Sequence, residues 1–181
     1  NDTFLVCCIL ANNETGVIQD FPAIAALTNE FIVGSAVHFG YEPVTDAELR
    51  GSWVETRERY PWLTAEVGGE FGGYAKAGSW RTRAAYQWSA EVGVYVCGRC
   101  RGAGVGSALY RELLDELRRR GFHSAIGGVT LPNDASVRLH ERLGFTHVGT
   151  FRHAGYKLGA WHDVGFWQVM LHGAGHAPAR V

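Results

Sequence analysis

The sequence predicts an α/β (α+β) fold, with a central mixed sheet and helices on both of its faces. Three observations lead to this prediction. Short apolar runs rich in β-branched residues are typical of strands, and longer segments with apolar residues at helical spacing are typical of helices. These segments follow the order β–α–α–β–β–β–α–β–α–β–β along the chain. With 181 residues, we expect one domain at residues 1–172 and a flexible C-terminal tail at residues 173–181.

The N-terminal part of the chain is expected to form one strand and two helices. The apolar run at residues 4–10 predicts the strand. Asp20 precedes a Phe-Pro pair and is expected to cap a helix that runs to about Val33. Thr45-Asp46-Ala47-Glu48 has the pattern of a capping box, which predicts a second helix that runs to about Arg59.

Three strands are expected in the middle of the chain. Residues 62–67 and 71–77 are expected to form a hairpin around the short connection Gly68-Gly69-Glu70. A third strand is expected at residues 91–97. Because side chains alternate across a strand, it should place three valines on one face: Val92, Val94 and Val96.

The C-terminal half is expected to alternate between helices and strands. Leucines at helical spacing predict a helix over residues 107–120, and Gly121 is expected just beyond its C-terminus. The remaining elements are expected as a strand at 123–129, a helix at 133–143 ended by Gly144, and strands at 146–152 and 164–171.

The composition argues against several classes of protein. Apolar residues make up 46% of the chain and charged residues 19%, which is typical of a globular protein. The net charge of −1 argues against general nucleic-acid binding. No apolar run approaches the ~20 residues of a membrane span. The first ten residues lack the basic start of a signal peptide. We therefore expect a cytoplasmic protein without a nucleic-acid or membrane partner.

A glycine-rich turn between an expected strand and an expected helix is the clearest candidate binding site. Its sequence is Arg101-Gly102-Ala103-Gly104-Val105-Gly106-Ser107. The backbone N–H groups of such a turn and the helix N-terminus favour a phosphate. The turn lacks the lysine of a nucleotide P-loop and the third glycine of a dinucleotide fingerprint. It does fit the pattern Arg/Gln-x-x-Gly-x-Gly/Ala. The alternative is a turn that holds no ligand.

This turn, with Val94-Tyr95-Val96 before it, resembles the acetyl-coenzyme A site of the Gcn5-related N-acetyltransferases (GNAT). A second segment, Asn133-x-x-Ser136-x-x-x-His140-x-x-x-Gly144-Phe145, resembles that family's Asn-x-x-Ala-x-x-x-Tyr-x-x-x-Gly-Phe pattern, with His140 at the tyrosine position. The resemblance implies a GNAT fold, a mostly antiparallel twisted sheet that binds acetyl-CoA where the strands splay after the fourth.

Over roughly residues 20–171 the chain more narrowly resembles phosphinothricin and methionine sulfoximine N-acetyltransferases. Cys97-Gly98-Arg99-Cys100 departs from these proteins, which carry His at the position of Cys100. The matching segments are Arg59-Tyr60-Pro61-Trp62-Leu63, Tyr74-Ala75, Ala77-Gly78-x-Trp80, Tyr86-x-Trp88, Glu91-x-x-Val94-Tyr95-Val96, Leu131-Pro132-Asn133-Asp134, Ser136-Val137-Arg138-Leu139-His140, Ala154-Gly155-Tyr156-Lys157 and Trp161-His162-Asp163-Val164-Gly165-Phe166-Trp167.

The resemblance implies roles for two titratable residues. Glu91 is expected to act as general base on the acceptor amine, directly or through a water; the alternative is a solvated carboxylate at the end of a strand. His140 is expected to protonate the leaving thiolate or to help remove the amine proton; the alternative is a packed core histidine. Tyr110 is expected to pack, with a supporting donor role as the weaker alternative. The residues expected to bind acetyl-CoA are Val94, Tyr95, Val96, Arg99, Arg101, Gly102, Ala103, Gly104, Val105, Gly106, Ser107, Asn133 and Ser136.

The acceptor implied by the resemblance is a small zwitterion or anion. Arg81 and Arg83 would share a face if they lay in a strand, and two guanidinium groups can clamp a carboxylate or phosphinate. The alternative is a solvated hairpin tip. Tyr86 is expected to add a hydroxyl and Phe39 an apolar wall. Family members form dimers, so a homodimer is expected.

The predicted function is transfer of the acetyl group of acetyl-CoA to the α-amino group of a small amino acid or analogue of phosphinothricin or methionine sulfoximine type. The alternatives are another amine acceptor (a polyamine, an aminoglycoside or a protein N-terminus) and a non-catalytic acetyl-CoA-binding module. No metal is expected. Cys97 and Cys100 lack two further ligands at zinc spacing, and a regulatory redox pair is the remaining alternative for them.

Overall fold

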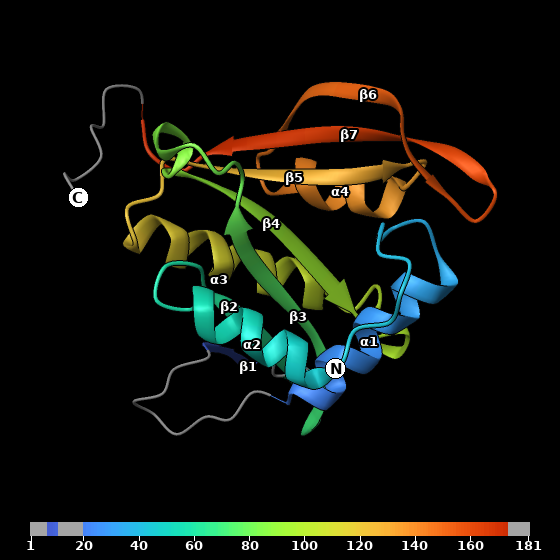
Figure 1. Ribbon diagram of the computed structural model, residues 1–181. Coiled ribbons are helices and arrows are strands. Elements are labelled where there is room, and N and C mark those ends of the chain that lie inside the picture. The colour runs from blue at the N-terminus through green and yellow to red at the C-terminus, as the bar shows by residue number, and fades with distance from the viewer. Residues whose placement is uncertain (1–6, 11–19, 174–181) are drawn as a thin grey trace.

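The computed structural model describes residues 7–10 and 20–173, and these residues form a seven-stranded sheet flanked by helices (Figure 1). The sheet order is β1-β2-β3-β4-β5-β7-β6. Every neighbouring pair is antiparallel except β4 and β5, which are parallel. The strands are β1 Cys7–Leu10, β2 Trp62–Val67, β3 Glu70–Ser79, β4 Ser89–Val96, β5 Ser124–Leu131, β6 Thr146–Lys157 and β7 Ala160–Met170.

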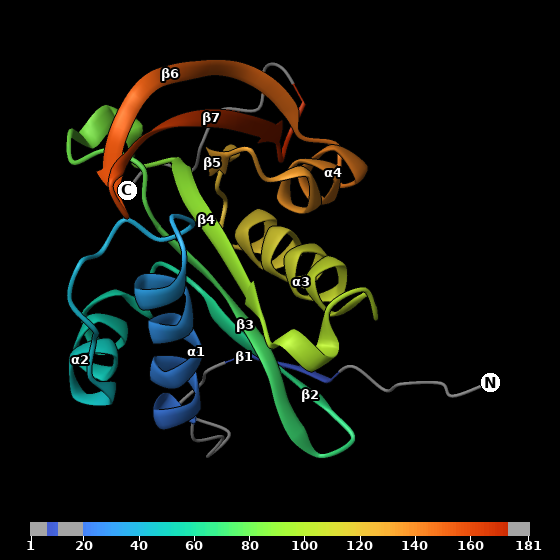
Figure 2. The ribbon, with the colours of Figure 1, turned by 90° about the vertical axis from the view of Figure 1, so that its right-hand side faces the viewer.

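Helices cover both faces of the sheet. In Figure 2, α1 and α2 lie on one side of β2–β4 and α3 lies on the other. Two buried clusters fill the space between these layers, one under α3 and one under α1 and α2. The helices are α1 Phe21–Gly34, α2 Asp46–Thr56, α3 Val105–Arg119 and α4 Asp134–Arg142, and two short 3₁₀ turns are η1 Ala84–Tyr86 and η2 Gly98–Cys100.

The leucine stripe of α3 forms the centre of the larger cluster. Leu109, Leu113 and Leu117 are each fully buried against the sheet. Burial of one such side chain contributes about 1.5–3 kcal/mol to folding. The helix therefore holds the glycine-rich turn at its N-terminus in a fixed position relative to β4.

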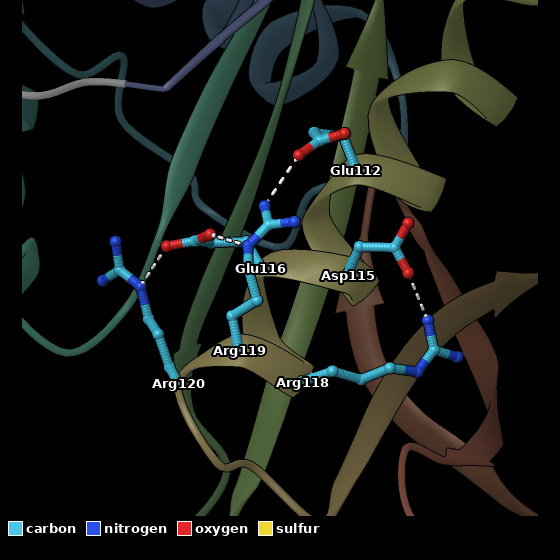
Figure 3. A network of polar contacts seen from close by, with 6 residues as sticks. All are labelled: Glu112, Asp115, Glu116, Arg118, Arg119 and Arg120. Atoms are coloured by element: carbon cyan, nitrogen blue, oxygen red, sulfur yellow. Dashed lines mark hydrogen bonds and ion pairs between the residues drawn. The ribbon is translucent and has the colours of Figure 1, made fainter.

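Ion pairs between residues of α3 itself link neighbouring turns at its C-terminal end (Figure 3). The Glu116 carboxylate accepts hydrogen bonds from Arg119 and Arg120, at 2.8 and 2.7 Å. Although burial opposes it, these hydrogen bonds hold the pKa of Glu116 below its usual 4.5. Arg120 also donates to the backbone carbonyl of Arg57 after α2. The helix end is thus anchored to the segment between α2 and β2.

The order of elements predicted from the sequence is confirmed, and so are both helix caps. Asp20 Oδ1 accepts a hydrogen bond from the N–H of Ala23, and Thr45 forms the full capping box with Glu48. Gly121 follows α3 with φ +78°, as expected. Residues 4–6 of the first expected strand and residues 174–181 of the expected tail lie outside the described residues.

Several boundaries differ from the prediction. β6 extends to Lys157 instead of residue 152, because its partner β7 begins already at Ala160. α2 ends at Thr56, before Arg59. α3 begins at Val105 rather than residue 107, directly after the glycine turn. In the described part of the chain, no helix is long and apolar enough to cross a membrane.

Candidate active site

The sheet opens between its two parallel strands. β4 and β5 pair only from Ser89↔Ser124 to Glu91↔Ile126, and beyond Glu91 the two strands diverge (Figure 1). Residues 92–96 of β4 therefore have no partner strand on the β5 side. This confirms the splay after the fourth strand that the sequence resemblance implied, and it leaves backbone groups of Val94, Tyr95 and Val96 available to an extended ligand.

The glycine-rich turn lies at the end of β4, beside this opening. Gly104 is the N-cap of α3 and adopts φ +87°, and Gly102 adopts φ +79°. Few residues other than glycine tolerate this left-handed conformation. The first turn of α3 begins at this turn, and its unpaired N–H groups and positive dipole end suit an anion. That residues 102–107 hold a pyrophosphate stays a prediction. The site therefore fits the phosphate and pantetheine parts of a coenzyme A.

The two arginines expected at the cofactor differ in their availability. Arg101 is exposed, with its guanidinium over the Phe31 ring at 5.4 Å and its Nε 3.4 Å from the carbonyl of Val96. Arg99 instead forms an ion pair with Glu70 at 2.9 Å and donates to the carbonyl of Phe71. Arg101 is the freer of the two to meet a phosphate.

Asn133 and Ser136 lie together at the N-terminus of α4. The Asn133 side-chain oxygen accepts a hydrogen bond from the backbone N–H of Ser136 at 3.2 Å and so caps the helix. The side-chain amide nitrogen of Asn133 has two hydrogens left to donate. Its expected bond to the pantetheine arm stays a prediction.

A cavity of about 400 Å³ lies on the α1–α2 side of β3 and β4. Glu91 and Phe39 line it, as the prediction of a base and an apolar wall requires. Sequence reasoning missed Lys76 and His38, which also line it. The signal for Lys76 was the alternation of β3, which places it on the same face as Tyr74. His38 lies in the loop after α1 and carries no such signal.

Burial and nearby charges act in opposite directions on the pKa of Glu91. Burial raises the pKa of Glu91 above its usual 4.5, while Lys76 and Arg81 oppose the rise. A raised pKa brings a carboxylate closer to the range in which a general base works at neutral pH. Across the cavity, the pKa of His38 is lowered by burial and by the positive charges of Lys76 and Lys157.

His140 lies in the core with 2% of its surface exposed. Its Nδ1 is 2.8 Å from the carbonyl of Ser136, which makes Nδ1 the protonated nitrogen, and its Nε2 is 3.2 Å from the Tyr110 hydroxyl. Burial lowers the pKa of His140, so the ring is neutral at pH 7. Tyr110 both packs and hydrogen-bonds, and its hydroxyl also lies 3.4 Å from the carbonyl of Val92 on β4.

The structure removes the strand on which the expected arginine clamp was argued, and the clamp itself stays a prediction. Arg81 and Arg83 lie in the irregular segment between β3 and η1 and not in a strand, so strand alternation does not place them on one face. Arg81 stacks on Trp80 at 4.9 Å. Arg81, Arg83 and Tyr86 are exposed, and none of them lines the cavity.

Cys97 directly precedes the η2 turn and Cys100 ends it. Cys97 and Cys100 are free thiols. Burial and the neighbouring Cys100 raise the pKa of Cys97, which disfavours the reactive thiolate. Within residues 7–10 and 20–173, no group of three or more His, Cys, Asp or Glu side chains is placed to hold a metal ion.

Comparison with known proteins identifies the family. Residues 24–145 match the model of the Acetyltransferase (GNAT) family. A phosphinothricin N-acetyltransferase of Streptomyces viridochromogenes is 49% identical over 149 residues, which are 82% of this chain and 81% of that protein. An L-methionine sulfoximine/L-methionine sulfone acetyltransferase of Salmonella typhimurium is 36% identical over 154 residues, or 84% of this chain and 90% of that protein.

The fold is also similar to that of a solved structure from the same family. The GNAT superfamily phosphinothricin acetyltransferase from Sinorhizobium meliloti, solved in complex with acetyl-CoA, superposes with a TM-score of 0.87. The alignment covers 95% of this chain and 93% of that one, at 28% identity. The resemblance read from the glycine turn and the segment 133–145 is confirmed. The chain belongs to the GNAT acetyltransferase family.

Proposed function

We propose that the protein transfers the acetyl group of acetyl-CoA to the α-amino group of a small amino acid or amino-acid analogue, of the phosphinothricin or methionine sulfoximine type. One observation carries the proposal. Glu91 lies at the last paired position of β4 before the splay, and its side chain lines a cavity of about 400 Å³ that suits a small acceptor. Relatives named for such acceptors support the choice of substrate.

Acetyl-CoA, when bound, supplies the thioester that is attacked. The chain's own residues then do four things. The glycine turn and Arg101 bind the phosphates, and the free edge of β4 positions the extended arm. A backbone N–H of Val94 or a neighbour donates to the carbonyl oxygen, where negative charge develops. Glu91 accepts the proton of the acceptor ammonium, directly or through a water.

His140 stays a proposed participant in proton transfer, and its burial and tautomer determine how it would act. Because Nδ1 carries the ring's one proton, Nε2 accepts a hydrogen bond from the Tyr110 hydroxyl, and we propose that His140 acts through that hydroxyl. In this neutral form Nε2 has no proton to give to the leaving sulfur, so His140 is a positioning residue that holds the Tyr110 hydroxyl, which also lies beside the Val92 carbonyl of β4.

The assembly and location are also proposals. Exposed aromatic side chains on the β6–β7 hairpin, Phe151, Tyr156 and Trp161, support a homodimer formed through this surface. Trp167, in contrast, is 4% exposed and belongs to the core. We propose a cytoplasmic enzyme whose single domain ends near residue 172.

A panel of acceptors tests the proposal. Purified protein is mixed with acetyl-CoA and phosphinothricin, methionine sulfoximine, methionine sulfone, common amino acids, a polyamine or an aminoglycoside, and release of free thiol is followed. We expect turnover with amino-acid acceptors and a loss of about 10²-fold or more in Glu91→Gln. Preference for polyamines would favour the alternative acceptor class. Tight coenzyme A binding without turnover would favour a non-catalytic module.

A further inference from the structure

The acceptor cavity holds a lysine that the function proposed above has not used. Lys76 lies on β3 opposite Gly93 of β4, and Glu91 lies on β4 opposite Gly78 of β3. Positions 76 and 78 share one face of β3, and positions 91 and 93 share the same face of β4. Lys76 and Glu91 are therefore diagonal neighbours on the cavity floor, a relationship that typically separates Cβ atoms by roughly 7 Å.

The two glycines opposite these charges keep the space between them open. A Cβ at Gly78 would meet nothing within 4 Å, and one at Gly93 would meet only the Tyr95 ring, at 3.8 Å. No side chain from the paired position therefore covers either charged group. A small molecule can lie between an ammonium on one side and a carboxylate on the other.

The Lys76 ammonium has hydrogen-bond donors left with which to bind an anion. Its contact is the face of the Trp62 ring, 4.9 Å away, and in the described part of the chain no carboxylate lies within ion-pair distance of it. Burial lowers the pKa of Lys76, and Glu91 opposes this. An ammonium carries three donors, and a half-buried one gains most from an anionic partner.

No other side chain that lines the cavity competes for this role. Among the described residues, Lys76 is the one Lys or Arg in the cavity lining. His38 lines the cavity too, but its lowered pKa makes it neutral at pH 7. Arg81 and Arg83 lie outside, with Arg81 held against Trp80.

We propose that Lys76 binds the α-carboxylate of the acceptor while Glu91 receives the proton of its α-ammonium. The cavity floor then matches both charges of a zwitterion, and Lys76 is the residue that selects α-amino acids over amines that lack a carboxylate. This inference rests on the proposed function, since it names the group that recognises the acceptor.

The test compares the best amino-acid acceptor of the panel with its carboxamide, which keeps the amine and loses the negative charge. The ratio of their kcat/KM values is measured in wild type, Lys76→Met, Lys76→Arg and Arg81→Met. Arg111→Met, at an exposed position of α3, is the matched control for loss of a positive charge. Binding of both acceptors in the presence of coenzyme A is measured by calorimetry.

We expect the wild type to prefer the acid by at least about tenfold, as a buried ion pair predicts. Lys76→Met should bring the ratio to within about threefold of one, mainly through KM of the acid. Lys76→Arg should keep most of the preference, and Arg111→Met all of it. Unchanged affinity for acetyl-CoA shows that Lys76→Met is folded.

Two results would overturn the inference. One is an acid preference that survives in Lys76→Met, and the other is a preference that disappears in Arg81→Met alone. Failure of the proposed function looks different, because the wild type would then acetylate neither acceptor. Calorimetry decides in that case. Loss of binding of the amino-acid acceptor in Lys76→Met alone supports the role of Lys76. Equal binding of that acceptor by the wild type and Lys76→Met refutes it.

Discussion

Lys157 at the end of β6 donates a hydrogen bond from Nζ to the backbone carbonyl of Ile32 near the end of α1, at 2.5 Å and across 125 positions of the chain. The same ammonium donates to the carbonyls of His38 and Gly40 in the loop after α1. Lys157 is only 4% exposed. One buried cation thus fixes the loop that forms a wall of the acceptor cavity to the β6–β7 hairpin.

Replacing Lys157 with Met should loosen this loop. Three carbonyl groups would lose their donor, that of Ile32 buried and those of His38 and Gly40 partly buried. A buried unsatisfied group costs about 1–3 kcal/mol, and relaxation and water entry reduce the sum. We expect a loss of about 3 kcal/mol in the free energy of unfolding, measured with urea, and a several-fold higher KM for the acceptor. Arg111→Met should change neither quantity by much. A Lys157→Met protein with wild-type stability would contradict the anchoring role.

Substitution of Gly155 tests the same wall without removing a charge. A Cβ at Gly155 would lie 2.4 Å from two atoms of the Phe39 ring, so Gly155→Ala must push that ring aside. Phe39 is 37% exposed and can move. We therefore expect stability to change by less than about 1 kcal/mol, since the clash is relieved at the surface. The acceptor KM should rise several-fold while the KM for acetyl-CoA stays constant; equal changes in both would argue against the assignment of Phe39.

Gly127 on β5 has no space for a side chain because His140 lies against it. A Cβ there would be 2.2 Å from Nε2 of His140. Gly127→Ala must displace the ring and break its hydrogen bond to Tyr110, at a cost of about 1–3 kcal/mol for an overpacked core. Gly51→Ala is the matched control: Gly51 is exposed within α2, a Cβ there meets nothing within 4 Å, and the change should stabilise by about 0.5–1 kcal/mol.

Measurements of activity distinguish a catalytic effect of Gly127→Ala from a simple loss of stability. If the His140–Tyr110 contact serves catalysis, Gly127→Ala should lower kcat at a temperature where the variant is fully folded, and Tyr110→Phe should lower it too. A fall in stability with unchanged kcat in both variants would show that His140 is a packing residue only.

The parts of the structure that depend on local sequence were predictable. Helix caps at Asp20 and Thr45, the glycine turn before α3 and the order of strands all follow from residues close together in the chain. Motif and strand position were enough to place Glu91 near the end of the β4–β5 pairing and Gly104 at the start of α3, while the roles of both residues stay predictions.

Features that depend on contacts between distant segments were not predictable. The role expected of Arg81 and Arg83 assumed a strand, but β3 ends at Ser79 and the chain turns away. Lys76 carries no motif, and only the register of β3 against β4 brings it beside Glu91. Lys157 was part of a matching segment, yet its bonds to the loop after α1 require the three-dimensional arrangement of β6. Tyr110 was expected mainly to pack, and only the fold places its hydroxyl beside His140.

The pH dependence of catalysis gives a direct test of the charges around Glu91. A general base must be ionised, so kcat/KM should fall as pH drops through the pKa of Glu91. Burial raises that pKa above 4.5, and the positive charges of Lys76 and Arg81 limit the rise. Removing one of these charges must therefore move the acid limb to higher pH.

We expect this shift in Lys76→Met, measured with the carboxamide acceptor so that loss of carboxylate binding does not enter. Arg81→Met should shift the limb in the same direction, Arg111→Met should leave it in place, and Glu91→Gln should abolish it. An acid limb that stays at the same pH in both Lys76→Met and Arg81→Met would show that the titrating group is not Glu91.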